Sequence, residues 1–415
     1  MHEWKRGSIH DEVSILLTFS GGGTRAAALA YGVMQELRDT GIVIDGGSAR
    51  MLDQVNHISS VSGGSFTAAY YGLHGDGLFE TFESDFLRYN IDKQLELQLI
   101  NPALWFSKTG RTDAAIKIYQ DKIFHDATFA DMNKPGRPMI VINASDLAYG
   151  IRFSFVQEYF DLLCSDLSSF PVARAVAASS AVPVLFEPVV LENYSDCSND
   201  QLAGVVRLRE FYQQNQDGSD NARLAALLMS YNDKDKRKFI HFVDGGITDN
   251  LGLRALSDIF EVAGGADAFM HNSNQRPPHR MVVIEVNAAT QSHREGMDQS
   301  SKQPRIHEVM SAVSTLQLER YDWDSVNIVE KNMEKWTEQL SSPQRTVSPY
   351  FVQIHLDHVD KKGWKILDDL PFNVKKIPTN FSLSDSQVDL LIEAGRRLLR
   401  EHPVYQELLS DLKAP

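Results

Sequence analysis

The sequence has little of what marks several classes of protein. Its 415 residues include only two cysteines, Cys164 and Cys197, too few for a disulfide framework or a four-ligand zinc site. The sequence leaves open whether these two form one bridge. No run of Lys and Arg interrupts a chain of net charge −14, which argues against a nucleic-acid partner.

Long apolar runs are also missing. The most apolar stretch, residues 171–191, includes an arginine, a proline and a glutamate, so no transmembrane segment is predicted. The first six residues, MHEWKR, do not lead into the apolar core of a signal peptide. We expect a soluble or membrane-peripheral chain, in the cytoplasm or, if a leader has been removed, in the periplasm or outside the cell.

The chain does contain a regular alternation of short apolar runs and helical patterns. The apolar runs predict strands at 13–19, 57–61, 138–144, 153–156, 238–243 and 281–286. Helical spacing predicts helices over 24–40, 63–73 and 306–340, and the capping box Ser384-x-x-Gln387 predicts a further one. This alternation is typical of a mainly parallel sheet covered by helices on both faces.

We therefore predict a three-layer α/β/α fold with helical insertions. We expect a single domain over residues 8–415, with its chemistry-bearing motifs inside 13–252. Polar stretches between the predicted elements suggest insertions near 75–137 and 193–237, and residues 253–415 are expected to form a helical C-terminal extension.

A turn between a predicted strand and a small-residue helix carries a candidate nucleophile. In Ser60-Val61-Ser62-Gly63-Gly64, small residues on either side allow a sharp turn that lifts the Ser62 hydroxyl clear of the sheet. The usual pattern is Gly-x-Ser-x-Gly, and Ser60 replaces its first glycine. The start of the following helix favours negative charge. The alternative interpretation is a Gly/Ser turn that caps an ordinary helix.

Three successive glycines follow the first predicted strand, in Gly21-Gly22-Gly23-Thr24-Arg25. Their N–H groups can face one spot without obstruction, where a phosphate or the oxyanion of a tetrahedral intermediate would bind. The run has neither the Gly-Lys-Ser/Thr ending of a P-loop nor the spaced glycines of a dinucleotide site. A tight packing loop is the alternative.

A candidate carboxylate ends another strand, in Phe242-Val243-Asp244-Gly245-Gly246. At the carboxyl end of a strand in an open α/β sheet, Asp244 would point into the ligand crevice. Asp249 is a competing acidic residue, and a plain Asp-Gly turn is the structural alternative.

No histidine has a pattern that marks it as a base. His57 lies within a predicted buried strand, and His241 alternates to the strand face opposite Asp244. Without a histidine, Asp244 would itself act as the base for Ser62, which a carboxylate can do where a dry site raises its pKa.

These segments together resemble the patatin-like phospholipase family. The family pattern is a Gly-Gly-Gly-x-Arg/Lys loop, a Gly-x-Ser-x-Gly elbow, an Ala-Ser-x-Ala-x-Pro segment and an Asp-Gly-Gly/Ala end. The matching segments occur here in the same order, within residues 15–252: Gly21 to Arg25, Ser60 to Gly64, Ala178-Ser179-Ser180-Ala181-Val182-Pro183, and Asp244 to Gly246. Asn143 to Leu147 is also similar to the central strand of the family.

The resemblance implies hydrolysis of fatty-acyl esters of phospholipids or neutral lipids at a membrane surface, without metal or organic cofactor. It assigns Ser62 as the acyl-accepting nucleophile and Asp244 as its base, with Ser179 to Pro183 shaping the wall of the site. It further implies oxyanion-hole donors and one supporting residue: Gly21, Gly22, Gly23, Gly63 and, in support, Arg25. Ser60 leaves open a non-catalytic lipid-binding or regulatory module, and soluble acyl esters or thioesters are alternative substrates.

A lipid hydrolase needs an apolar entrance for acyl chains. The segment from Leu95 to Phe106, rich in Leu, Trp and Phe, is a candidate rim or lid, with an ordinary core stripe as the stronger alternative. At net charge −14, adsorption to anionic membranes would depend on apolar insertion rather than on long-range attraction.

Overall fold

A computed structural model of the protein describes residues 12–44, 46–94, 110–195, 197, 203–215, 219–272, 275–290, 301, 303, 306–356 and 374–413. For residues 203, 306–319 and 375 the description covers the backbone alone. The candidate rim from Leu95 to Phe106 therefore lies outside the described residues.

The centre of the fold is one eight-stranded sheet, ordered β10-β9-β1-β4-β5-β8-β7, with β6 paired to β5. The first five strands in this order are parallel, whereas β6, β7 and β8 run antiparallel to their neighbours. A separate hairpin pairs β2 (Gly41–Ile44) with β3 (Gly47–Arg50). The strands of the main sheet are β1 (Val13–Phe19), β4 (Val55–Val61), β5 (Met139–Asp146), β6 (Ile151–Ser154), β7 (Val189–Glu192), β8 (Phe239–Asp244), β9 (Arg280–Asn287) and β10 (Ser348–His355).

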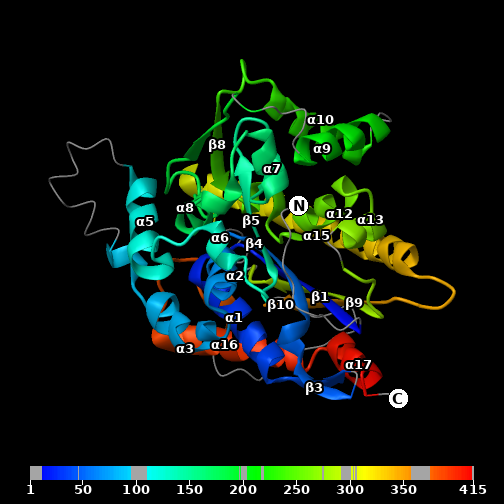
Figure 1. Ribbon diagram of the computed structural model, residues 1–415. Coiled ribbons are helices and arrows are strands. Elements are labelled where there is room, and N and C mark those ends of the chain that lie inside the picture. Colours follow the sequence, from blue (N-terminus) through cyan, green and yellow to red (C-terminus); the bar gives the residue numbers. More distant parts are fainter. Residues whose placement is uncertain are drawn as a thin grey trace.

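Helices cover both faces of this sheet (Figure 1). On one face lie α1 (Gly23–Asp39), α2 (Gly63–His74) and α16 (Asp385–Arg400), and on the other α12 (Leu253–Val262), α13 (Ala266–Asn272) and α15 (Ile306–Leu340). The further α-helices of the described residues are α3 (Leu78–Phe82), α5 (Arg111–Tyr119), α6 (Phe129–Met132), α7 (Gln157–Leu162), α8 (Val172–Ser179), α9 (Ala203–Gln214), α10 (Asp220–Met229), α11 (Gly246–Asp249) and α17 (Pro403–Asp411).

The central strands are buried on both faces because alternate residues contact different helical layers. In β1, Ile15 and Leu17 belong to the apolar cluster that includes α1, α2 and α16. Leu16 belongs to the second cluster, with Phe260 of α12 and Trp336 of α15. This two-sided burial explains why β1 is apolar almost throughout instead of alternating with polar residues. It confirms the predicted three-layer α/β/α fold.

Near the C-terminus, α16 packs tightly on α1 and so contributes to the main core. A Cβ added to Gly32 of α1 would lie 2.1 Å from the Ile392 carbonyl oxygen, and one added to Gly395 would lie 2.4 Å from that of Leu29. These two glycines are required where the helix backbones approach this closely. The C-terminal segment is therefore built into the layer that also carries the first glycine loop.

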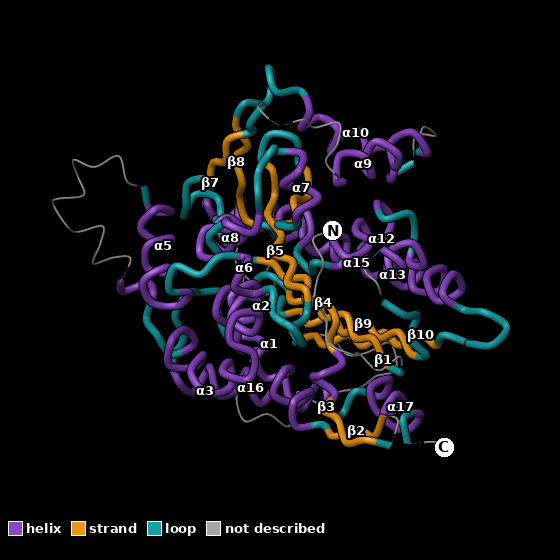
Figure 2. The backbone as a smooth tube through the Cα atoms, viewed as in Figure 1, coloured by secondary structure: helices purple, strands orange, loops and turns teal. Residues whose placement is uncertain are grey.

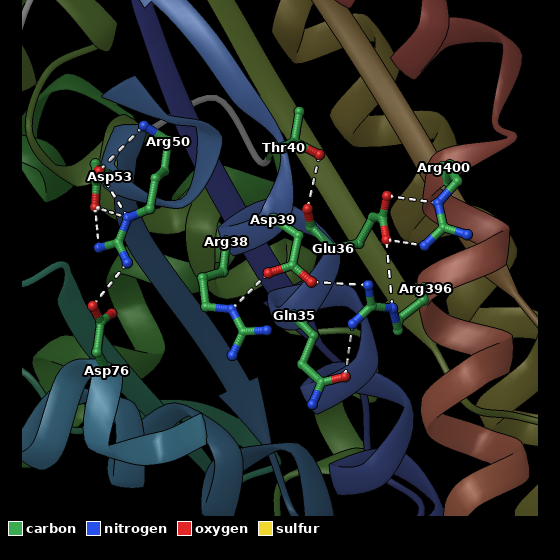
Figure 3. A network of polar contacts seen from close by, with 10 residues as sticks. All are labelled: Gln35, Glu36, Arg38, Asp39, Thr40, Arg50, Asp53, Asp76, Arg396 and Arg400. Atoms are coloured by element: carbon green, nitrogen blue, oxygen red, sulfur yellow. Dashed lines mark hydrogen bonds and ion pairs between the residues drawn. The ribbon is translucent and has the colours of Figure 1, made fainter. Parts of the chain in front are cut away.

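Ion pairs connect α1 to α16 along the edge of their contact (Figure 3). The buried carboxylate of Glu36 accepts two hydrogen bonds from Arg400, at 2.8 and 2.6 Å. Arg396 donates to Asp39 at 2.8 Å and to Gln35 at 3.3 Å. The buried charge of Glu36 is thus paired, as a carboxylate removed from water requires.

Most of the predicted elements are present, and the differences concern the edges of the sheet. The strand expected at 153–156 is β6 at Ile151–Ser154, and β7, β10 and the β2–β3 hairpin (Figure 2) were not predicted. Cys164 and Cys197, whose pairing the sequence left open, form a disulfide. Of the helices within the described ranges, none has the length and apolar content needed to span a bilayer.

Candidate active site

Ser62 occupies a strained turn between β4 and α2. Its backbone has φ 50° and ψ −119°, in the positive-φ region that side-chain-bearing residues rarely adopt. Space around the turn is so limited that a Cβ on Gly63 would lie 2.0 Å from the Gly23 carbonyl oxygen, and one on Gly64 would lie 2.6 Å from the Cβ of Phe19. This geometry is the sharp strand-to-helix turn predicted from the small residues.

Asp244 reaches Ser62 from the far side of β5. On one side of β5, Val61 of β4 pairs in parallel with Asn143, and on the other side Asp244 of β8 pairs in antiparallel with Ala144. The ends of β4 and β8 therefore lie at the same level of the sheet, although the two strands run in opposite directions. Asp244 thus lies at the carboxyl end of its strand, as expected, but that strand is antiparallel to β5, and the placement of Asp244 in a ligand crevice stays a prediction.

The two side chains are directly hydrogen-bonded. The Ser62 hydroxyl donates to Asp244 Oδ2 at 2.8 Å, and the Gly246 N–H donates to Oδ1 at 2.8 Å. Both groups are buried. A hydroxyl at this distance from a carboxylate has the geometry that general-base activation requires.

The surroundings shift the proton affinity of Asp244 upward. Burial raises the pKa of this carboxyl from 3.8 to about 6, although the hydrogen bonds from the Gly246 N–H and the Ser62 hydroxyl favour the charged form. A base whose pKa lies near neutrality both remains ionised at pH 7 and holds a proton well once it has accepted one.

The C-terminal end of α8 and the residues after it hold the backbones of both residues. The Ser179 hydroxyl accepts a hydrogen bond from the Ser62 N–H at 2.8 Å and donates to the Asn143 carbonyl oxygen at 2.6 Å. The Asp244 N–H donates to the Ala181 carbonyl oxygen at 2.9 Å. The sequence suggested only that residues 179–183 form a wall; in the structure, Ser179 also holds the turn that carries Ser62.

The glycine loop lies against the same turn and offers unoccupied N–H groups. Among the described residues, no acceptor occupies the N–H groups of Gly22, Gly23 or Gly63, and the last two begin helices, where N–H groups lack an intrahelical partner. The Gly21 N–H, expected to point to the same spot, instead donates to the Asn250 carbonyl oxygen at 3.0 Å. Its use there leaves three of the four expected donors unoccupied.

A distant segment supports the loop from behind. Arg25 is buried and donates to the Ile377 carbonyl oxygen at 2.8 Å and to the Thr290 hydroxyl at 3.2 Å. The Thr24 N–H donates to the Asn380 carbonyl oxygen at 2.9 Å. Arg25 thus links the start of α1 to Thr290 and Ile377, and its supporting role stays a prediction. Sequence reasoning missed residues 377–380, since nothing in their local pattern indicates a partner 352 positions away, the separation of Arg25 and Ile377.

The competing residues point elsewhere. Asp249 accepts a hydrogen bond from a backbone N–H of α12 at 2.8 Å. His57 is buried against Phe269, with ring centroids 5.3 Å apart, and His241 is exposed. Across the described residues, no group of three or more His, Cys, Asp and Glu side chains has an arrangement that could hold a metal ion.

Exposed apolar side chains follow two segments of the site closely in the sequence. Val184 is 88% exposed and has φ 76°, a strained conformation for a β-branched residue, three positions after the residue that binds the Asp244 N–H. Its neighbour Leu185 is 52% exposed, and Ile247, three positions after Asp244, is 42% exposed. We call these three residues the apolar rim.

Comparison with known proteins yields one family and a set of distant structures. The family model described as patatin-like phospholipase matches residues 17–257, which include Ser62 and Asp244. No curated protein matches the sequence.

The solved structures similar to this chain include human GIVD cytosolic phospholipase A2, with 10% identity and a TM-score of 0.44 over 96% of this chain and 62% of that one. The same enzyme with methyl gamma-linolenyl fluorophosphonate gives 11% identity and a TM-score of 0.41, over 97% of this chain and 59% of that one. The chain thus spans about three fifths of the length of these proteins.

Proposed function

Because the chain belongs to the patatin-like phospholipase family, we propose that it is a serine hydrolase that cleaves fatty-acyl esters of lipids through Ser62 and Asp244. The observation that carries this proposal is the 2.8 Å hydrogen bond from the Ser62 hydroxyl to a buried carboxylate. Acyl transfer requires at least a nucleophile in contact with a general base, and a raised pKa makes this carboxylate a better base.

The proposed reaction has two halves. Asp244 accepts the proton of Ser62 as its Oγ attacks the ester carbonyl carbon, and the same proton then passes to the departing alcohol as the ester bond breaks. Asp244 then takes a proton from water as the water oxygen attacks the acyl carbon, and it returns this proton to the Ser62 Oγ as the acyl–oxygen bond breaks and the fatty acid leaves. The N–H groups of Gly22, Gly23 and Gly63 are the proposed donors to the oxyanion, supported by the N-terminal end of α2.

The direct test removes the hydroxyl. Ser62→Ala should abolish release of fatty acid from phosphatidylcholine vesicles, and folding is checked by circular dichroism. Ser60→Ala is the matched control, because the Ser60 hydroxyl is buried two positions away and donates to the Val141 carbonyl oxygen at 3.1 Å rather than to the site. The proposal fails if Ser62→Ala retains the wild-type rate.

The apolar rim supports an aggregated lipid, rather than a soluble ester or thioester, as the substrate. Exposed apolar residues a few positions from the segments that carry the buried pair would contact acyl chains at a bilayer surface, and at net charge −14 a zwitterionic surface suits this chain better than an anionic one. Leu185→Asp should lower hydrolysis of vesicles much more than hydrolysis of a short-chain soluble ester. Val43→Asp is the control, since Val43 is 65% exposed on the β2–β3 hairpin; an equal effect of both variants would reject the lipid surface.

A further inference from the structure

We propose that Asn250 and Asp322 form a positioning pair that holds the glycine loop and the Asp244 turn together for catalysis. The inference rests on the proposed function and assigns two residues that neither the motifs nor the mechanism uses. Their side chains are hydrogen-bonded to each other, whereas the Ser62 hydroxyl is hydrogen-bonded to Asp244, so their action would pass through the backbone that carries the proposed catalytic groups.

Asn250 lies between the two loops. Its carbonyl oxygen accepts the Gly21 N–H at 3.0 Å, which ties it to the glycine loop. Its side-chain oxygen is so close to both backbones that a Cβ on Gly21 would lie 2.8 Å from it, and one on Gly246 would lie 3.2 Å from it. Gly246 in turn donates to Asp244, so Asn250 contacts both the loop of the oxyanion donors and the turn of the base.

Asp322 of the long helix α15 fixes the orientation of the Asn250 amide. Asn250 Nδ2 donates to Asp322 Oδ2 at 3.1 Å. An ionised carboxylate only accepts hydrogen bonds, so the amide must turn its nitrogen to Asp322 and its oxygen to the two glycines. Without that acceptor nothing holds the Asn250 amide in this orientation, and the contact of its oxygen with Gly21 and Gly246 is lost or altered.

The charge on Asp322 controls the strength of this bond. Four polar or charged groups face Asp322: Asn250 and Asp249 after the Asp244 turn, Glu285 of β9 and His355 of β10. The cation of α12, Arg254, instead donates to Ser325, one turn further along α15. Burial, with smaller contributions from Glu285 and Asp249, raises the pKa of Asp322 to about 7, whereas the Asn250 hydrogen bond and His355 act in the opposite direction.

The direction of the pH effect follows from this. Above about pH 7 the charged carboxylate makes a charge-assisted hydrogen bond to the Asn250 amide. Below it, the protonated acid can donate as well as accept, so it no longer forces one orientation of the amide. The Asn250 amide should therefore be held in one orientation in alkaline solution and lose this restraint in mildly acidic solution.

The first test is the pH dependence of kcat on a short-chain soluble ester. In the wild type, kcat should rise with Asp244 ionisation near pH 6 and continue to rise as Asp322 ionises near pH 7. Asp322→Asn keeps a hydrogen-bonding group that does not titrate. The kcat of this variant should therefore reach its plateau after the rise near pH 6, without the second rise near pH 7. Asp324→Asn is the control on the exposed side of the same helix and should keep the wild-type curve.

The second test separates positioning from a general loss of stability. Asp322→Leu should lower kcat about tenfold at pH 8, the effect of one lost hydrogen bond, and leave KM within about twofold. Asn250→Asp should be impaired because two carboxylates then face each other, and the double variant Asn250→Asp/Asp322→Asn should regain activity because the pair is restored in reverse.

Two results would overturn the inference in distinguishable ways. If Ser62→Ala retains full hydrolysis, the proposed function fails and the pair has no reaction to position. If Ser62→Ala is inactive but Asp322→Asn keeps the wild-type pH curve and the double variant regains nothing, the function stands and the positioning pair is rejected.

Discussion

Replacing Asp244 by asparagine should abolish turnover and stabilise the fold above pH 6. The site buries this carboxyl and raises its pKa from 3.8 to about 6, so its proton is bound more tightly in the folded than in the unfolded chain. A group of this kind contributes fully to stability below about pH 4, and that contribution is lost as the pH rises through about 6. The difference between the two pKa values corresponds to about 3 kcal/mol of unfolding free energy.

The assay is urea unfolding of the wild type and Asp244→Asn between pH 4.5 and 8. The variant keeps an oxygen that can accept the Gly246 N–H, so its advantage in unfolding free energy should be about 1 kcal/mol at pH 4.5 and approach about 3 kcal/mol at pH 8. Asp249→Asn is the matched control, because burial also raises the pKa of Asp249 whereas its carboxylate binds α12 instead of Ser62. It should show a similar trend in stability with hydrolysis retained. An advantage for Asp244→Asn that does not change with pH would refute the reasoning.

Three further substitutions test other parts of the site and the fold. Gly63→Ala should abolish activity, as measured by ester hydrolysis, because the new Cβ would lie 2.0 Å from the Gly23 carbonyl oxygen; a fully active variant would contradict the geometry. Arg25→Met should lower kcat more than it raises KM, because it loosens the loop of the oxyanion donors without touching the wall of the site; steady-state kinetics decide this. Cys164→Ser should lower the unfolding free energy by about 3–4 kcal/mol, since the bridge to Cys197 closes a loop over a sequence separation of 33, while the folded variant keeps its kcat; denaturant unfolding measures the loss.

The parts of the site that the sequence made predictable are those built by neighbouring residues. The turn of Ser62 and the glycine loop each join a strand to a helix within a few positions, so residue size alone indicates their geometry. The two-sided burial of β1 was predictable for the same reason, since an uninterrupted apolar run is typical of a central strand.

The parts of the fold and the site that the sequence did not predict depend on contacts between residues far apart in the chain. The antiparallel direction of β8 is set by its partners β5 and β7, and nothing within residues 239–244 indicates it. Asn250, Asp322 and Asn380 have ordinary local surroundings and gain a place in the site only when α11, α15 and the segment before α16 come together. β10 was missed because, as an edge strand, it alternates buried with partly exposed residues.

The most direct measurement of the central claim is the rate at which an alkyl fluorophosphonate labels the protein as a function of pH, with the modified residue identified by mass spectrometry. If Ser62 is activated by Asp244, the label is found on Ser62, its rate rises with a midpoint near pH 6, and Asp244→Asn is not labelled. A label on another residue, or an equal rate of labelling in Asp244→Asn, would contradict the account.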